Sequence, residues 1–200
     1  MTVFLRPVAN PLPLGFLALG AATLLVSGLQ LEWLQPADGA QVGMILIAFV
    51  FPLQLMVSVF GFLARDVVAG TGMGILAGAW LAVGLIRLTG EPGSTSDALG
   101  LFLLFAAAAM LVPASAASTG KLVAFAVLGT TALRFALTGA YELTAGDGWK
   151  TAAGVVGVVL CAIAVYAALA MALEDVLDRT VLPVGRRGPL EGEPGVRPQL

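Results

Sequence analysis

The residues Asn10-Pro11-Leu12-Pro13-Leu14-Gly15 stand where a short polar N-terminus passes into the first long apolar run of the chain. The Asn-Pro and Leu-Pro steps disfavour helix before each proline, whereas Pro13 suits the first turn of a helix. We therefore expect a helix that begins close to Pro13. Its first amides lack partners within the helix, and Gly15 lets another group come close, so this helix start suits a carboxylate.

Apolar runs of this kind fill the rest of the chain. Of its 200 residues, 59% are hydrophobic and 11% are charged, and the mean hydropathy is +0.99. This charged fraction is far below that of a soluble domain. Helices of about 20 residues cross the hydrocarbon of a bilayer. We predict an all-α integral membrane protein with six such helices, at Pro13 to Leu31, Val42 to Leu63, Val67 to Leu88, Leu99 to Ser118, Leu122 to Leu143 and Thr151 to Leu173.

Three parts follow from these spans. Residues 1–12 form an N-terminal tail, residues 13–176 the transmembrane domain, and residues 177–200 a C-terminal tail that we expect to be largely disordered. Most basic residues fall on the side of the membrane where the termini lie. Only Arg87 and Lys150 fall on the other side, and those on the side of the termini are Arg6, Arg65, Lys121, Arg179, Arg186, Arg187 and Arg197. We therefore expect a multi-pass protein of the plasma membrane with both termini in the cytoplasm.

The composition excludes several classes of function. The chain has no histidine, one cysteine and a formal net charge of −2. Histidine-dependent catalysis and histidine zinc sites are thereby excluded, and no basic cluster indicates nucleic acid as a partner. No Gly-Lys-Ser/Thr phosphate loop is present to use ATP. We expect no enzyme activity, no catalytic residue, no metal site and no cofactor.

Arg134 is the most informative charge, because it lies well inside the fifth predicted span. Thr131, Arg134, Thr138 and Glu142 are three or four residues apart, so they share one face of that helix. Two interpretations stay open. The stripe lines a pathway in which Arg134 attracts a carboxylate, or Arg134 forms a structural salt bridge with Glu142 or Glu32.

Other residues in the spans also allow two interpretations each. Gln54 could donate to a solute or bridge helices. The glycines at 70, 74 and 78 indicate close helix packing or room for a pore, and those at 154 and 157 a contact within or between subunits. Pro52 and Pro113 are expected to kink their helices. Caps are expected from the aspartates that precede three of the runs, Asp66, Asp97 and Asp147.

The opening stretch is similar to the Asn-Pro-Ala-Pro-Leu-Gly signature of the acetate uptake transporter family, which includes the bacterial succinate-acetate permeases. Leu12 stands where that family has alanine. The stretch Arg179-Thr180-Val181-Leu182-Pro183-Val184-Gly185 resembles its closing Arg-Thr-Val-Leu-Pro-Ile-Gly. Gln54, the run from Asp66 to Trp80 and Phe135-Ala136-Leu137 can be laid on the helices between, so the resemblance covers nearly the whole chain.

The resemblance implies a six-helix subunit, commonly in a homohexamer, in which each subunit has its own central pore for acetate, succinate or similar acids. It places an apolar constriction at Leu19, Leu76 and Thr131. The aromatic residues usual there are replaced, and Arg134 stands where the family is apolar. A wider constriction with a cation beside it favours a larger or more highly charged carboxylate than acetate.

We therefore predict a transporter or channel for small carboxylates, driven by a gradient, with proton coupling left open. Its partners are the organic carboxylate, the lipid bilayer and further copies of the chain. The alternative from another class is a membrane scaffold that retains the fold and transports nothing. The predicted substrate pathway comprises Asn10, Pro11, Gly15, Leu19, Gln54, Leu76, Thr131, Arg134 and Thr138.

Overall fold

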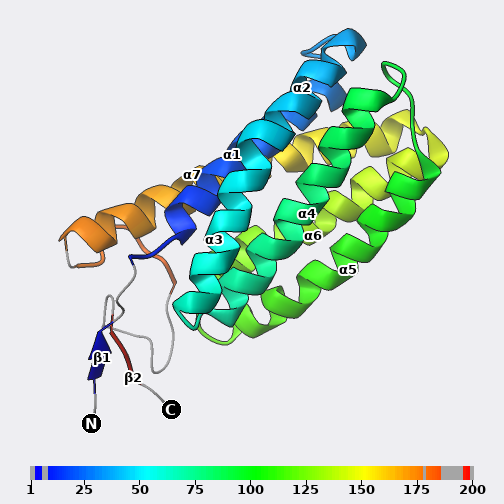
Figure 1. Ribbon diagram of the computed structural model, residues 1–200. Coiled ribbons are helices and arrows are strands. Elements are labelled where there is room, and N and C mark those ends of the chain that lie inside the picture. Colours follow the sequence, from blue (N-terminus) through cyan, green and yellow to red (C-terminus); the bar gives the residue numbers. More distant parts are fainter. Residues whose placement is uncertain (1–2, 6–8, 178, 186–195, 199–200) are drawn as a thin grey trace.

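The computed structural model describes residues 3–5, 9–177, 179–185 and 196–198, and within them six helical spans are long and apolar enough to cross a membrane. The spans lie side by side as one bundle (Figure 1). All six predicted spans are confirmed, and the last runs well beyond its predicted bounds. The helices are α1 (Leu12–Gln30), η1 (Pro36–Asp38), α2 (Gly39–Ile45), η2 (Leu46–Val50), α3 (Phe51–Leu63), α4 (Val67–Thr89), α5 (Asp97–Ser118), α6 (Leu122–Thr144) and α7 (Asp147–Leu177).

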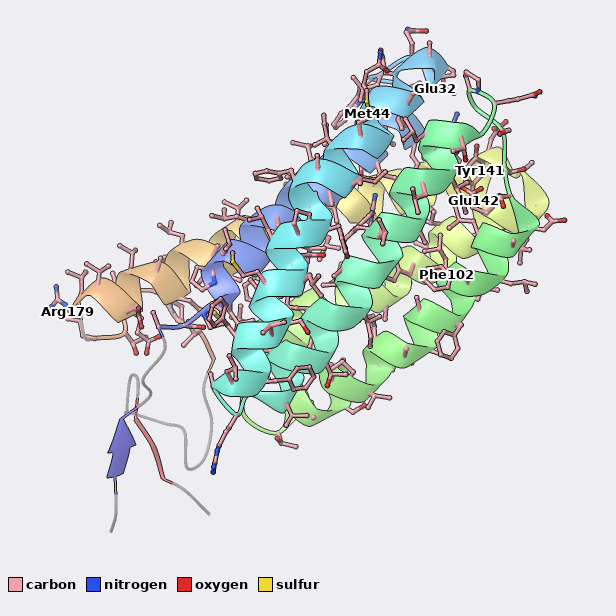
Figure 2. All side chains as sticks on the ribbon, in the orientation of Figure 1. Glu32, Met44, Phe102, Tyr141, Glu142 and Arg179 are labelled. Carbon is pink, nitrogen blue, oxygen red and sulfur yellow. The ribbon has the colours of Figure 1, made fainter. Side chains whose placement is uncertain are left out.

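The spans close into a ring, in which each packs against two neighbours in the order α1, α3, α4, α5, α6, α7 and back to α1. Helices α1, α4 and α6 therefore alternate with α3, α5 and α7. Many large apolar side chains on the outside are exposed, among them Leu101, Phe105 and Val112, as expected for a surface that meets lipid. Figure 2 shows Glu32 and Glu142 toward one end of the bundle and Arg179 at the other end.

The second span is interrupted just before Pro52. It passes from the α-helix α2 through the π-helical segment η2 into α3, where Pro52 lies in the first turn. Because proline lacks an N–H and its ring crowds the carbonyl four residues earlier, the preceding turn opens. The distortion expected at Pro52 thus takes the form of a π-helical turn, whereas α5 continues through Pro113 as one helix.

Side chains cap α4 and α5. At α1, which begins one residue before Pro13, Asn10 Oδ1 accepts from Leu12 N at 3.1 Å from outside the helix, ahead of the N-cap residue Pro11. The cap expected from Asp66 is confirmed, since its Oδ1 accepts from Ala69 N at 3.1 Å. The cap expected from Asp97 is wrong, because Ser96 one residue earlier reaches the Leu99 amide and leaves Asp97 inside the first turn.

The closing stretch folds back onto the start of α6. Leu122 N donates to Gly185 O at 3.2 Å and Val123 N to Val184 O at 3.4 Å, which satisfies amides that have no partner within the helix. Val184 is buried, and Gly185 has a φ of +64°, a conformation that favours glycine. The Arg-Thr-Val-Leu-Pro-Val-Gly stretch is therefore a cap for α6.

The two tails meet in a short antiparallel ribbon of β1 (Val3–Leu5) and β2 (Val196–Pro198). The prediction of a disordered C-terminal tail falls mainly on residues 186–195, which lie outside the described residues. The predicted domain boundaries stay predictions.

The glycine stripe on α4 is a packing surface over two of its three positions. A Cβ on Gly70 would meet the Phe62 ring at 2.7 Å, and a Cβ on Gly74 would meet Ser58 Oγ at 2.9 Å, both on α3. Gly78 has open space. The glycines therefore bring α3 and α4 together.

Candidate functional site

Among the described residues, a small cavity lies toward each end of the ring. Each has a volume of about 10 Å³, about the space of one water molecule. The termini-side cavity is lined by Leu12, Phe16, Asp66, Val68, Ala69, Gly72, Met73, Lys121, Ala124 and Leu128. The distal cavity is lined by Val26, Trp80, Val83, Arg87, Leu99, Leu103, Arg134, Phe135, Thr138 and Glu142.

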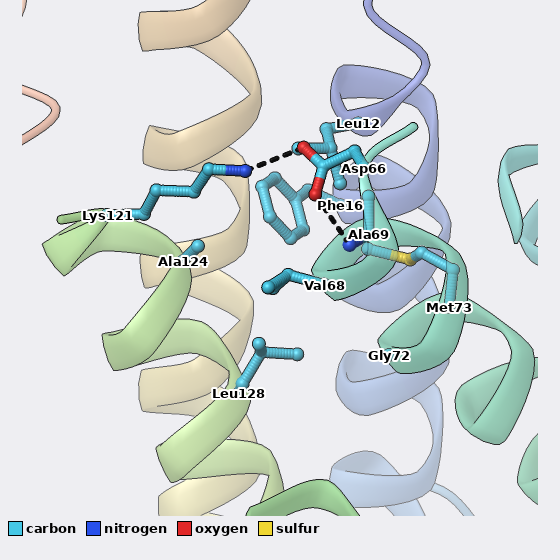
Figure 3. Close-up of a pocket in the computed structure, with 10 residues that line it drawn as sticks. All are labelled: Leu12, Phe16, Asp66, Val68, Ala69, Gly72, Met73, Lys121, Ala124 and Leu128. Atoms are coloured by element: carbon cyan, nitrogen blue, oxygen red, sulfur yellow. Dashed lines mark hydrogen bonds and ion pairs between the residues drawn. The ribbon is translucent and has the colours of Figure 1, made fainter. Parts of the chain in front are cut away.

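An ion pair joins α4 to the start of α6 at the termini-side cavity. Lys121 Nζ lies 2.7 Å from Asp66 Oδ2, while the other oxygen of Asp66 caps α4 (Figure 3). The rest of the lining is apolar, including Leu12 and Phe16 from α1. One carboxylate thereby fixes both the start of α4 and its distance from α6.

Arg134 is buried, with 1% of its surface exposed, and points from α6 toward α1. Its Nη2 donates to Thr23 O at 3.2 Å, Ser27 Oγ at 3.4 Å and Gln30 Oε1 at 3.5 Å. Its Nε is buried and has no hydrogen-bond partner among the described residues. The guanidinium is therefore held by long hydrogen bonds to neutral oxygens and retains a donor.

An aromatic face completes the surroundings of Arg134. Its Cζ lies 5.5 Å from the centre of the Trp80 ring, a cation–π arrangement. Trp80 packs edge to face with Phe135 at a centroid distance of 5.7 Å, which ties α4 to α6 across the ring. The Trp80 ring therefore both packs between α4 and α6 and contacts the cation.

Neither carboxylate suggested as a salt-bridge partner of Arg134 binds it. Glu142 pairs with Arg87 and accepts from Ser96 N at 2.9 Å. Glu32 pairs with Lys150 at 2.8 Å, and this hydrogen bond lowers the pKa of the Glu32 carboxyl. Within the described part of the chain, no carboxylate oxygen lies within 4.0 Å of the Arg134 guanidinium. Instead Arg134, Thr138 and Glu142 line one cavity, and Thr138 accepts from Gln30 Nε2 at 3.3 Å.

Gly157 on α7 provides the space that Arg134 occupies. A Cβ at this position would overlap both Ser27 Oγ and Arg134 Nε. Gly154, one turn earlier, meets Leu31 in the same way. These small residues of α7 therefore pack within the subunit.

The three residues expected at the constriction are fully buried. Leu19, Leu76 and Thr131 lie on α1, α4 and α6, between the positions of each helix that line the termini-side cavity and those that line the distal cavity. The Thr131 hydroxyl donates to Val127 O of its own helix at 2.7 Å. Apolar side chains thus separate the two cavities.

The remaining predicted residues gather near the start of α1 and line neither cavity. Asn10 and Pro11 are half-buried there. A Cβ on Gly15 would meet Met73 Sδ at 2.8 Å, so a side chain of this protein takes up the close approach that the glycine allows. Gln54 is buried and donates to Gly15 O at 3.4 Å, which bridges α3 and α1.

Sequence reasoning missed Arg87, Ser27 and Gln30 as neighbours of the Arg134 site. A signal for Arg87 is present, since the pairs Asp66 with Lys121 and Arg87 with Glu142 are each 55 residues apart. Leu76 with Thr131 and Trp80 with Phe135 share that separation. It reflects the matching register of α4 and α6. Ser27 and Gln30 gave no comparable signal.

Comparison with known proteins places this arrangement in a family. The GPR1/FUN34/yaaH family profile matches residues 1–184. The chain belongs to this family. No curated protein matches the chain. The solved structure of the bacterial acetate channel SatP has 23% sequence identity and a TM-score of 0.79, over 89% of this chain and 99% of that one.

The likeness to that structure establishes the fold of this GPR1/FUN34/yaaH protein. A six-helix membrane fold is therefore supported by the sequence profile, by the structural match and by the spans of this chain. The cation at Arg134 and the two ion pairs between α4 and α6 are features of its own residues.

Proposed function

We propose that the protein conducts small organic carboxylates, such as acetate or succinate, along the centre of its ring of spans. The observation that carries this proposal is the buried guanidinium of Arg134, surrounded by neutral oxygens. A charge at membrane depth is costly and normally faces a cavity, a partner or water. No carboxylate of the described residues pairs with it, so a solute carboxylate is the fitting counterion.

The pathway in this proposal runs along α1, α4 and α6. Asn10, Pro11 and Gly15 form its termini-side mouth with Gln54 beside them, Leu19, Leu76 and Thr131 form the constriction, and Arg134 and Thr138 form the anion site. Neither of the two cavities, each with room for about one water molecule, holds acetate as it stands. Conduction requires the apolar side chains at the constriction to move apart.

The setting of the pathway belongs to the same proposal. The basic residues favour a plasma-membrane protein with cytoplasmic termini. The acetate channel named above and the family membership support passive or gradient-driven transport rather than catalysis. The broad apolar exterior suits both lipid and further copies of the chain, and we propose a homo-oligomer, a hexamer by the family resemblance.

Uptake of labelled acetate and succinate into proteoliposomes tests the proposal. We expect saturable uptake that exceeds the uptake by protein-free liposomes. Unlabelled acetate should inhibit the uptake of labelled succinate, and unlabelled succinate that of labelled acetate. An imposed proton gradient tests for proton coupling. If transport is coupled to protons, the acid accumulates above the level that its own concentration gradient would give. A folded protein that takes up neither acid would contradict the proposal and favour the scaffold.

A further inference from the structure

Arg87 and Glu142 form an ion pair on the wall of the cavity that Arg134 also lines. Arg87 lies in the last turn of α4 and Glu142 in the last turn of α6. Glu142 has a fully buried side chain, whereas the Arg87 side chain is 15% exposed. The arginine therefore stands between the cavity and the end of the bundle opposite the termini.

The Glu142 carboxylate is held by Arg87 and a backbone amide, as a bound carboxylate ligand would be. One oxygen of Glu142 accepts from Arg87 Nη2, and the other accepts from Ser96 N at 2.9 Å, while Arg87 Nη1 donates to Ser94 O at 3.0 Å. The Nε of Arg87 is buried without a hydrogen-bond partner among the described residues. A planar guanidinium with an unused donor can take a second carboxylate or exchange one for another.

Two arginines on one cavity constrain the ligand. Glu142 stands eight residues after Arg134 on α6, about 12 Å along the helix axis. While Glu142 pairs with Arg87, a monocarboxylate at Arg134 balances the remaining charge of the cavity. An acid with a carboxylate at each end pairs with both guanidinium groups only when the carboxylate of Glu142 leaves Arg87.

We propose that Arg87 is a second carboxylate-binding residue of the pathway, that Glu142 occupies it when no substrate is bound, and that the distal cavity selects dicarboxylates held between Arg87 and Arg134. This inference rests on the proposed function, of which it names the substrate class. It makes Glu142 an internal competitor of the substrate. Removal of Glu142 and removal of Arg87 then act in opposite directions, whereas in a purely structural ion pair both removals weaken the protein alike.

The fluorescence of Trp80 can report ligand binding separately from transport. The chain has three tryptophans, and Trp33 and Trp149 are 61% and 48% exposed and line neither cavity. In a Trp33→Phe, Trp149→Phe background, the fluorescence of Trp80 beside Arg134 reports titrations with succinate and with acetate. Chloride at matched ionic strength is the control ligand.

We expect Glu142→Gln to bind succinate severalfold more tightly than the background protein. Arg87→Gln should bind it about tenfold more weakly, as for the loss of one charge-assisted contact, and lose the preference for succinate over acetate. If Glu142→Gln or Arg87→Gln does not fold, Glu142→Asp and Arg87→Lys replace them. We expect tighter succinate binding for Glu142→Asp and weaker succinate binding for Arg87→Lys.

Two results would overturn the inference while leaving the proposed function in place. In one, both substitutions lower the affinity for succinate together or leave it unchanged in a protein that transports carboxylates. In the other, the protein binds acetate and succinate equally. Absence of binding and of uptake for both acids in the unsubstituted protein would instead defeat the proposed function itself.

Discussion

Gly157 of α7 lies directly against the guanidinium of Arg134 on α6, so a methyl group on the glycine would overlap Arg134 Nε. The same methyl group would overlap Ser27 Oγ, which accepts a hydrogen bond from the arginine. Because Gly157 has no side chain, α7 leaves the space in which the Arg134 guanidinium lies against α1. The position of the proposed anion site therefore depends on Gly157, which has no functional group of its own.

Gly157→Ala should therefore displace Arg134 and lower the free energy of unfolding by about 1–3 kcal/mol, the usual cost of overpacking a core. Thermal unfolding of the purified protein measures the stability, and Trp80 fluorescence reports succinate binding, which should weaken. Gly78→Ala is the matched control, because a Cβ there meets no atom within 4 Å. Equal effects of the two substitutions would contradict the packing account.

Leu76→Val should raise carboxylate flux severalfold, with the larger gain for succinate. The substitution removes one methylene from a fully buried side chain between the two cavities and costs about 1 kcal/mol of stability. Leu101→Val on the exposed surface is the control and should leave flux unchanged. Proteoliposome uptake measures both. If Leu76→Val alters stability alone, Leu76 does not limit the pathway.

Asp66→Asn and Asp66→Ala separate the two roles of this side chain. Asparagine keeps an oxygen for the Ala69 amide but loses the charge that pairs with Lys121. We expect Asp66→Asn to lower the free energy of unfolding by about 1–3 kcal/mol. Asp66→Ala should cost about 1 kcal/mol more, because the cap is lost as well. Identical unfolding temperatures for the two variants would show that the cap contributes nothing.

Gly185→Ala should release the closing stretch from the start of α6. A side chain at φ +64° is strained, and its Cβ would meet Leu122 Cβ at 2.7 Å, so we expect a loss of about 1–3 kcal/mol. Hydrogen–deuterium exchange at Leu122 and Val123, whose amides this stretch caps, should become faster. Gly148→Ala, which meets no atom within 4 Å, is the control. Unchanged exchange at both amides would refute the capping role.

The spans could be predicted because their length and hydropathy are set by the bilayer, a local property of the sequence. The cap at Asp66 was equally local. The choice of Ser96 over Asp97 was not, because two adjacent acceptors compete for one amide and the exact first turn decides. A distortion before Pro52 follows from the proline itself, whereas its π-helical form was not evident from the sequence.

The candidate site was predictable only in part. That Arg134, Thr138 and Glu142 share a face follows from helical spacing, and they do line one cavity. The partner of each charge does not follow, because it depends on which helices face one another across the ring. Glu142 binds Arg87 across α4 and α6, and Arg134 turns to α1, since Gly157 leaves space there.

Arg134→Gln tests the central claim most directly, in proteoliposomes that take up labelled acetate and succinate. A buried cation with neutral partners is costly, so the variant should unfold at the same or a higher temperature. Arg65→Gln, which removes the same charge from an exposed position, is the matched control. We predict that Arg134→Gln loses saturable uptake of both acids and Arg65→Gln keeps it. Saturable uptake by a folded Arg134→Gln protein at the level of the unsubstituted protein would contradict the account.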